Sequence, residues 1–194
     1  MLAVKYSVQF GKDLGMSKIG RKPIDVGAVK IEIQGRDVHY QGTHAKGVHV
    51  VPDLLSVAMD GGQLFVTVAQ QTSDTFRLWG LHRALLANKI LGADKGFEKR
   101  VNIVGLGFKA IKKGVGLEFS LGFSHKIEFP LPKGLTVEID KTGQVLTVWS
   151  PDKELLGHVC SKICALRPTE PYKGTGIHCA GDIIRRKAGK AKGS

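Results

Sequence analysis

Apolar and polar positions alternate along two stretches of the chain that resemble each other. Residues 57–68 read VAMDGGQLFVTV, and residues 137–149 read VEIDKTGQVLTVW. In each stretch an apolar strand enters a glycine-containing turn and a second apolar strand leaves it, which is the pattern of a β-hairpin. The Gly-Gln pairs of the two stretches begin at Gly62 and Gly143, 81 residues apart. This spacing indicates an internal duplication.

A helical pattern of apolar positions follows each hairpin. The first begins near Ser73 and Asp74, and Gly92 is placed to end it. The second has Ser150 as the expected N-cap and Pro151 at the first helical position, and Pro168 stops it. Further alternating stretches precede the hairpins, and we expect them to be strands: 30–38 and 39–51 in the first half, and 101–111, 115–123 and 126–129 in the second.

These elements predict an α+β protein of two similar tandem domains, each an antiparallel sheet with a helix packed on one face. We expect the first domain over residues 16–95 and the second over residues 96–182, followed by a basic tail over residues 183–194. Residues 1–15 are interpreted as an extension that is either untranslated or disordered. They match neither a secretory signal nor a transit peptide.

The charge of the chain indicates which class of molecule it binds. Lys and Arg number 29 against 17 Asp and Glu, a net charge of +12. Nine of those excess charges lie in residues 1–24 and 167–194, and the run over residues 185–192 contains no acidic residue. Such a segment repels itself until a polyanion neutralises it. Nucleic acid is therefore the favoured partner, because neither predicted helix is basic enough on its polar face to bind a membrane surface.

The remaining composition excludes several classes of protein. An apolar share of 42% supports a packed core rather than a disordered chain. No apolar run reaches the roughly 18–20 residues that span a bilayer. Three cysteines without a secretory signal favour a reducing cytosol over a disulfide framework. Cys160 and Cys164, with Cys179, His158 and His178, lack the close CxxC pairing of a zinc site, so no metal is expected.

Residues 105–110 read GLGFKA, the GxGxxA spacing of a dinucleotide-binding turn. That motif requires a helix after the turn, whereas the sequence after Ala110 alternates like a strand. A glycine-bent strand or bulge is the favoured interpretation, and a nucleotide-dependent enzyme that uses the turn from Gly105 to Ala110 is the alternative function. Ser124 and His125 are adjacent on a predicted strand and point to opposite faces, so they do not form a nucleophile–base pair.

A second glycine-rich segment, residues 170–177, reads EPYKGTGI and leads into the basic tail. We expect its glycines to expose backbone N–H groups to a phosphate. Lys173 adds a positive charge, and Tyr172 adds a face on which a base can stack. An ordinary loop with a core tyrosine is the alternative interpretation.

Several segments together make the chain resemble a known family, the bacterial-type large-ribosomal-subunit protein six (L-six) family. Residues 17–24 (SKIGRKPI) are similar to its amino terminus, residues 105–110 to its glycine turn, residues 121–125 (LGFSH) to its LGYSH segment, and residues 169–177 to its PEPYKGKGI signature. The resemblance runs from about Ser17 to Lys192. Thr175, His178 and Cys179 depart from the residues that are usual in the family.

The resemblance implies a structural, non-enzymatic constituent of the large ribosomal subunit that supports translation. It implies binding to 23S rRNA near the stalk base and the elongation-factor site, mainly through the second domain and tail, beside neighbouring large-subunit proteins. No cofactor, metal, membrane or small-molecule substrate is expected, and the expected location is the cytoplasmic ribosome, with an organellar ribosome left open. The implied rRNA contacts are Tyr172, Lys173, Gly174, Gly176, Arg185, Arg186, Lys187, Lys190 and Lys192, with Lys18, Arg21 and Lys22 as weaker candidates.

Overall fold

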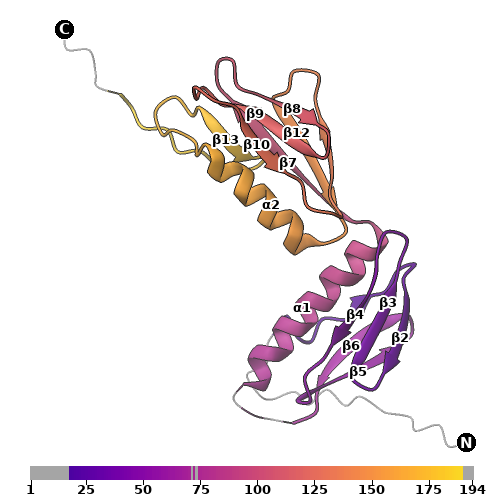
Figure 1. The fold of residues 1–194 in the computed structure, drawn as a ribbon. Helices are drawn as coiled ribbons and strands as arrows, with labels where there is room; N and C mark the ends of the chain where they lie inside the picture. The colour runs from indigo at the N-terminus through magenta and orange to yellow at the C-terminus, as the bar shows by residue number, and fades with distance from the viewer. Residues whose placement is uncertain (1–17, 71, 73, 190–194) are drawn as a thin grey trace, which may run out of the picture. The chain divides into compact units, whose positions relative to one another are not determined.

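The structure is a computed structural model that describes residues 18–70, 72 and 74–189 (Figure 1). Within these described residues, the first half contains six strands and a helix: β1 (Ile24–Asp25), β2 (Lys30–Gln34), β3 (Asp37–Gln41), β4 (Lys46–Val50), β5 (Leu55–Asp60), β6 (Gln63–Val68) and α1 (Thr75–Asp94). The second half contains β7 (Phe97–Val104), β8 (Lys109–Lys113), β9 (Gly116–Ser120), β10 (Ile127–Pro130), β11 (Thr136–Ile139), β12 (Val145–Ser150), α2 (Lys153–Leu166) and β13 (Gly176–Cys179).

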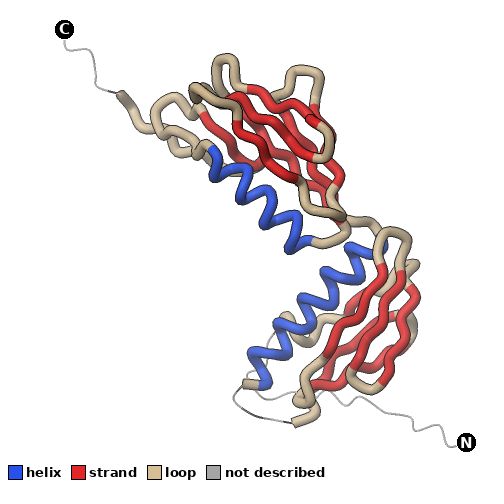
Figure 2. The backbone as a smooth tube through the Cα atoms, in the orientation of Figure 1, coloured by secondary structure: helices blue, strands red, loops and turns tan. Residues whose placement is uncertain are grey.

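Both halves combine antiparallel strands with one helix that lies along one side of the strands (Figure 2). The predicted α+β class is therefore confirmed, with one difference. Each half contains two sheets rather than one: β1-β6-β5 and β2-β3-β4 in the first half, and β11-β12-β7-β13 and β10-β9-β8 in the second. None of the helices among the described residues is long and apolar enough to cross a membrane.

The two predicted hairpins form as the repeat indicated. β5 pairs antiparallel with β6, with Val57 opposite Val66, and β11 pairs antiparallel with β12, with Val137 opposite Val148. Three of the predicted strands are each broken by a turn, and the stretch 39–51 is one of them, since β3 ends at Gln41 and β4 begins at Lys46. The stretch 30–38 turns at Gly35, and the stretch 101–111 turns between β7 and β8 at Gly107. Both glycines adopt the left-handed conformation that such turns require.

Two expected helix boundaries were wrong. Gly92 does not end α1, because the helix continues to Asp94 and the left-handed Gly96 follows it. Gly92 instead packs so tightly that an added Cβ would lie 2.0 Å from the Pro151 carbonyl oxygen. Ser150 is not the N-cap of α2. Asp152 is the N-cap, since its carboxylate accepts a hydrogen bond from the Glu154 N–H at 2.9 Å.

The chain forms two compact units whose limits differ from a simple division of the sequence. One contains the described residues up to Gly27, with Ile31–His39 and Val48–Ala87. The other contains Ala28–Lys30, Tyr40–Gly47 and the described residues from Asn88 onward. The limits proposed from the sequence, 16–95, 96–182 and a tail from 183, stay predictions. Residues 1–15 lie outside the described residues.

The core of the second unit joins its two sheets to α2. Leu156, Val159, Cys160 and Ile163 form the buried face of the helix. They belong to one cluster with Val101, Leu146 and Val148 of the four-stranded sheet and with Leu117 and Phe119 of β9. The helix ends at Leu166 because Pro168 holds the residue before it, Arg167, in an extended conformation.

The sequence did not predict strand β13, which begins at Gly176 within the glycine-rich segment. It pairs antiparallel with β7, placing Gly176 opposite Val104 and Cys179 opposite Val101. Ile177 is only 2% exposed. Gly176 has φ +141°, and an added Cβ would lie 2.6 Å from the Pro168 carbonyl oxygen, so the strand begins where only glycine fits. Ile177 and Cys179 of β13 are thus part of the core.

Replacing Ile177 by Ala tests the role of β13 in the core. We expect the free energy of unfolding in urea to fall by about 2–5 kcal/mol, because a buried aliphatic side chain is lost and a cavity remains. Ile183→Ala is the matched control, since Ile183 is 91% exposed, and its expected effect is within about 0.5 kcal/mol. Equal effects of the two substitutions would contradict the placement of β13.

Candidate nucleic-acid interface

A closed loop over residues 169–175 connects α2 to β13. The Glu170 N–H donates to the Thr175 carbonyl oxygen at 2.8 Å, and the Gly174 N–H donates back to the Glu170 carbonyl oxygen at 2.9 Å. The Thr175 hydroxyl also donates to the Glu170 carboxylate at 3.1 Å. These bonds give the loop one shape. It presents Tyr172, which is 55% exposed, and Lys173, which is also exposed.

Gly174 and Gly176, the two glycines that were predicted to contact rRNA, are buried. The N–H of Gly174 is already donated within the loop, and the Arg186 side chain covers Gly174, with its Nε 3.1 Å from where a Cβ would lie. Gly176 lies in β13. Both glycines thus have a structural role, and their contact with RNA stays a prediction.

The start of the basic tail folds back onto the same loop. The Lys187 N–H donates to the Pro171 carbonyl oxygen at 2.9 Å. Arg185, Arg186 and Lys187 are exposed. The structure therefore brings these three cations together with the loop that carries Tyr172 and Lys173. We call these five residues the basic edge. The other two tail candidates, Lys190 and Lys192, lie outside the described residues.

The amino-terminal candidates belong to the other compact unit. Lys18, Arg21 and Lys22 are exposed in the turn before β1. The carbonyl oxygens of Lys22 and Pro23 accept hydrogen bonds from the Arg83 guanidinium at 3.0 and 2.8 Å, which attaches this turn to α1. The turn therefore presents its cations from a fixed backbone.

Four side chains of the second unit that contact one another were not selected from the sequence as candidate RNA contacts. The Arg167 guanidinium lies over the rings of Phe108 and Phe123, 5.1 and 4.9 Å from their centroids. Phe123 in turn stacks on His125. Phe123 directly follows Gly122 in the sequence, which could have indicated an aromatic residue presented by a turn. Its contact with Arg167 could not be predicted, because it depends on the fold.

The GxGxxA turn does not form a dinucleotide site. The Phe108 N–H donates to the Gly105 carbonyl oxygen at 3.3 Å, and the Ala110 N–H donates to the Gly143 carbonyl oxygen at 2.8 Å. The element that follows is strand β8, not a helix. Without a helix N-terminus, the turn lacks the group that binds a pyrophosphate.

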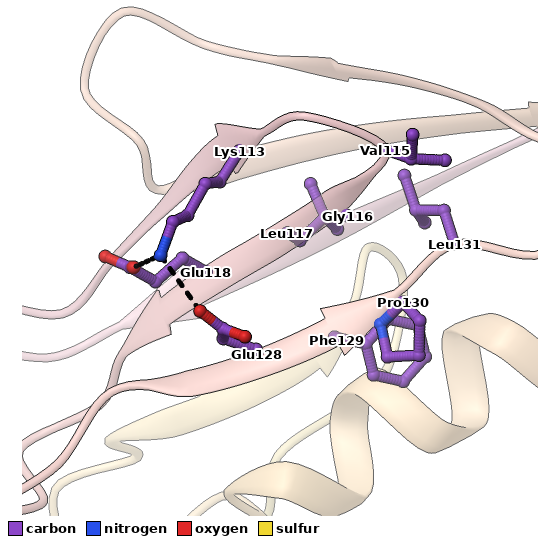
Figure 3. Close-up of a pocket in the computed structure, with 9 residues that line it drawn as sticks. All are labelled: Lys113, Val115, Gly116, Leu117, Glu118, Glu128, Phe129, Pro130 and Leu131. Carbon is purple, nitrogen blue, oxygen red and sulfur yellow. Dashed lines mark hydrogen bonds and ion pairs between the residues drawn. The ribbon is translucent and has the colours of Figure 1, made fainter.

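A cavity of about 540 Å³ lies beside the hairpin of β8 and β9 and is also lined by β10 (Figure 3). Its charged side chains pair with one another: the Lys113 ammonium lies 2.9 Å from the Glu128 carboxylate and 3.2 Å from that of Glu118. Lys126 also contacts Glu118 at 2.6 Å. Hydrogen bonds from Lys126 and Lys113 lower the pKa of Glu118, so its carboxylate stays ionised and is a poor general base at neutral pH.

The three cysteines are free, and Cys164 and Cys179 lie with their sulfur atoms 3.7 Å apart. Burial, followed by the neighbouring Cys179, raises the pKa of Cys160 to about 11 and that of Cys164 to about 12. Both groups are therefore protonated thiols at neutral pH. Among the residues that the structure describes, no cluster of three His, Cys, Asp or Glu side chains is placed to hold a metal ion.

The chain is similar to known ribosomal proteins over most of its length. The family model described as Ribosomal protein L6 matches residues 104–179, the span from the end of β7 to β13. The protein named Large ribosomal subunit protein uL6 from Beijerinckia indica subsp. indica is 38% identical over 178 residues, covering 91% of this chain and 100% of the relative. The protein of the same name from Anaeromyxobacter sp. (strain Fw109-5) is 43% identical over 176 residues, covering 90% and 98%.

The chain thus belongs to the ribosomal protein L6 family. The relatives are named as ribosomal proteins and not as enzymes. Together with strand β8 after the glycine turn, this overturns the alternative of a nucleotide-dependent enzyme that uses Gly105 to Ala110.

The raised pKa values of Cys160 and Cys164 predict slow reaction with a disulfide reagent. Relative to the ordinary value of 9.0, a pKa of about 11 lowers the thiolate fraction at pH 8 about a hundredfold. We expect the Cys179→Ser variant, which retains only these two thiols, to react at least about tenfold faster in urea than when folded, as measured by thiol release at pH 8. Burial, the largest cause of the raised pKa values, remains in this variant, so the folded rate should still rise at pH values where the rate in urea has levelled off. Equal rates with and without urea would contradict the burial of these thiols.

Proposed function

We propose that this chain is a structural constituent of the large ribosomal subunit that binds 23S rRNA through its second unit. Membership of the ribosomal protein L6 family supports the first part of the proposal. The observation that carries the second part is the basic edge, where the carboxyl-terminal cations are held against the loop with Tyr172 and Lys173.

Electrostatics supply the affinity in this proposal. Each phosphate that a Lys or Arg neutralises releases a condensed counterion, so binding weakens as salt rises. About six to eight such contacts predict a log–log slope on the order of −5 to −7. The affinity therefore comes mostly from phosphate contacts, which carry no sequence information by themselves.

In this proposal, the shape of the protein surface determines which phosphates the cations contact. The hydrogen bonds across the 169–175 loop and the Lys187–Pro171 bond fix the basic edge on the core before RNA is present. A fixed array of cations matches the phosphates of one folded RNA surface better than those of others. Folded RNA is recognised largely by shape and backbone, and this arrangement suits that mode.

The proposed position on the ribosome is near the stalk base and the elongation-factor site, beside neighbouring large-subunit proteins. This position rests on the family resemblance of the 169–177 signature. In the proposed arrangement the second unit and tail contact the RNA, and the chain has no catalytic role in translation.

Removing the tail cations without removing the strand they follow tests the electrostatic part of the proposal. The tail variant replaces Arg185, Arg186, Lys187, Lys190 and Lys192 by Gln, which leaves Ile177 in the core. Binding of the full chain to bacterial 23S rRNA is measured across a salt series. We expect a slope of about −5 to −7 for the natural sequence and a slope that is shallower by about 4.5 for the variant, since each of the five lost contacts removes about 0.9.

The control variant lowers the net charge equally at exposed positions away from the basic edge. It replaces five exposed lysines by Gln: Lys30, Lys46, Lys95, Lys133 and Lys141. Its slope should stay within one unit of that of the natural sequence. A flat salt response of the natural chain would refute RNA binding through phosphates. Equal losses in the two variants would refute the placement of the interface at the basic edge.

Crosslinking on assembled ribosomes tests the proposed position. A photoreactive phenylalanine analogue replaces Tyr172, which is exposed and lies in the loop. After irradiation of large subunits that contain the variant, we expect crosslinks to 23S rRNA at the stalk base. The same analogue at Val115, which is 85% exposed on the hairpin of β8 and β9, is the comparison. Crosslinks from position 172 only to RNA remote from the stalk would contradict the position.

A further inference from the structure

Four planar side chains form a continuous series from the core of the second unit to its surface. Phe108 is 9% exposed, and the Arg167 guanidinium lies 5.1 Å from the centre of its ring. The same guanidinium lies 4.9 Å from the ring centre of Phe123. Phe123 stacks on His125, with ring centres 6.0 Å apart and an angle of 23° between the planes. Arg167 is half-buried, Phe123 is 45% exposed, and His125 is exposed.

The loop that carries Phe123 and His125 is anchored at its start. Leu121 is 1% exposed, and its carbonyl oxygen accepts from the Arg167 guanidinium at 3.0 Å. Gly122 has φ +75°, and a Cβ there would lie 2.8 Å from the Phe108 ring. The turn therefore needs glycine, and it directs the next residue outward. These contacts hold the Phe123 ring at the surface without burying it.

We propose that Phe123 and His125 form a stacking platform for an unpaired nucleobase of RNA. Arg167 is its positioning residue, because it holds the Phe123 ring from the protein side by a cation–π contact. A nucleobase extends such a series because it offers a flat π-face of similar size, and stacking on aromatic side chains does not require a particular base. The inference rests on the proposed function, since the ligand is a base of the RNA that the basic edge binds.

The platform is connected to the basic edge through Arg167. The Arg167 carbonyl oxygen accepts from the Ile177 N–H at 2.8 Å, which ties it to the strand that follows the 169–175 loop. Its guanidinium binds the 121–125 loop at the same time. One residue thus joins a surface for bases to a surface for phosphates. Proteins that bind single-stranded nucleic acid combine these two surfaces.

A Phe123→Leu variant keeps an apolar side chain of similar volume and removes the ring on which His125 stacks, and with it the aromatic platform. Binding of the full chain to bacterial 23S rRNA is measured across the same salt series. We expect the dissociation constant to rise about 5- to 150-fold, the range for the loss of one base–aromatic stack. We expect the salt slope to stay unchanged, because no phosphate contact is lost. Val115→Ala is the control and should leave both quantities unchanged.

A Phe123→Trp variant restores the aromatic face, so its dissociation constant should return to within about threefold of the natural value. Its indole fluorescence, measured against the natural chain, should be quenched on binding RNA. Natural affinity in the Leu variant would overturn the platform while leaving phosphate binding intact. Weak binding by both variants would also overturn it, because the position would then be needed for shape and not for stacking. Absence of salt-dependent binding by the natural chain would instead refute the proposed function, and the platform with it.

Discussion

The antiparallel pairing of β13 with β7 is the contact on which the candidate interface depends. It inserts Ile177 into the core beside α2 and so fixes the chain on both sides of the strand. The 169–175 loop is closed because its end enters β13, and the tail returns over the loop because it leaves from the other end of the same strand. The cations of this edge therefore have defined positions, although Arg185, Arg186 and Lys187 follow the last strand that the structure describes.

The same constraint explains the two glycines of the signature segment. A phosphate-binding loop uses glycine to bring backbone N–H groups close to the ligand. Here Gly174 lies beneath Arg186, and Gly176 fits against the Pro168 carbonyl oxygen. They allow the loop to pack closely on the protein, and the side chains of Tyr172, Lys173 and the tail provide the surface. Recognition in this arrangement comes from side chains on a rigid frame.

Local patterns predicted the elements that depend on nearby residues, and they failed where distant contacts decide. The hairpins β5–β6 and β11–β12 follow from alternation around glycine turns, and both helices follow from their apolar faces. Gly92 was misread because Pro151, far along the chain, makes glycine necessary inside α1. Strand β13 is four residues long and begins at a glycine, so only its partner β7 identifies it as a strand. The stack of Phe123 on Arg167 likewise joins residues from separate elements.

Amide hydrogen exchange of the full chain, with and without bacterial 23S rRNA, tests the location of the interface most directly. The fast-exchanging amides of loops report protection by a ligand over the whole chain in one measurement. We expect RNA to protect residues 121–126 and 169–187, and to leave α1 and the hairpin of β5 and β6 unchanged. Protection confined to the first unit, with the 169–187 segment unaffected, would contradict the account.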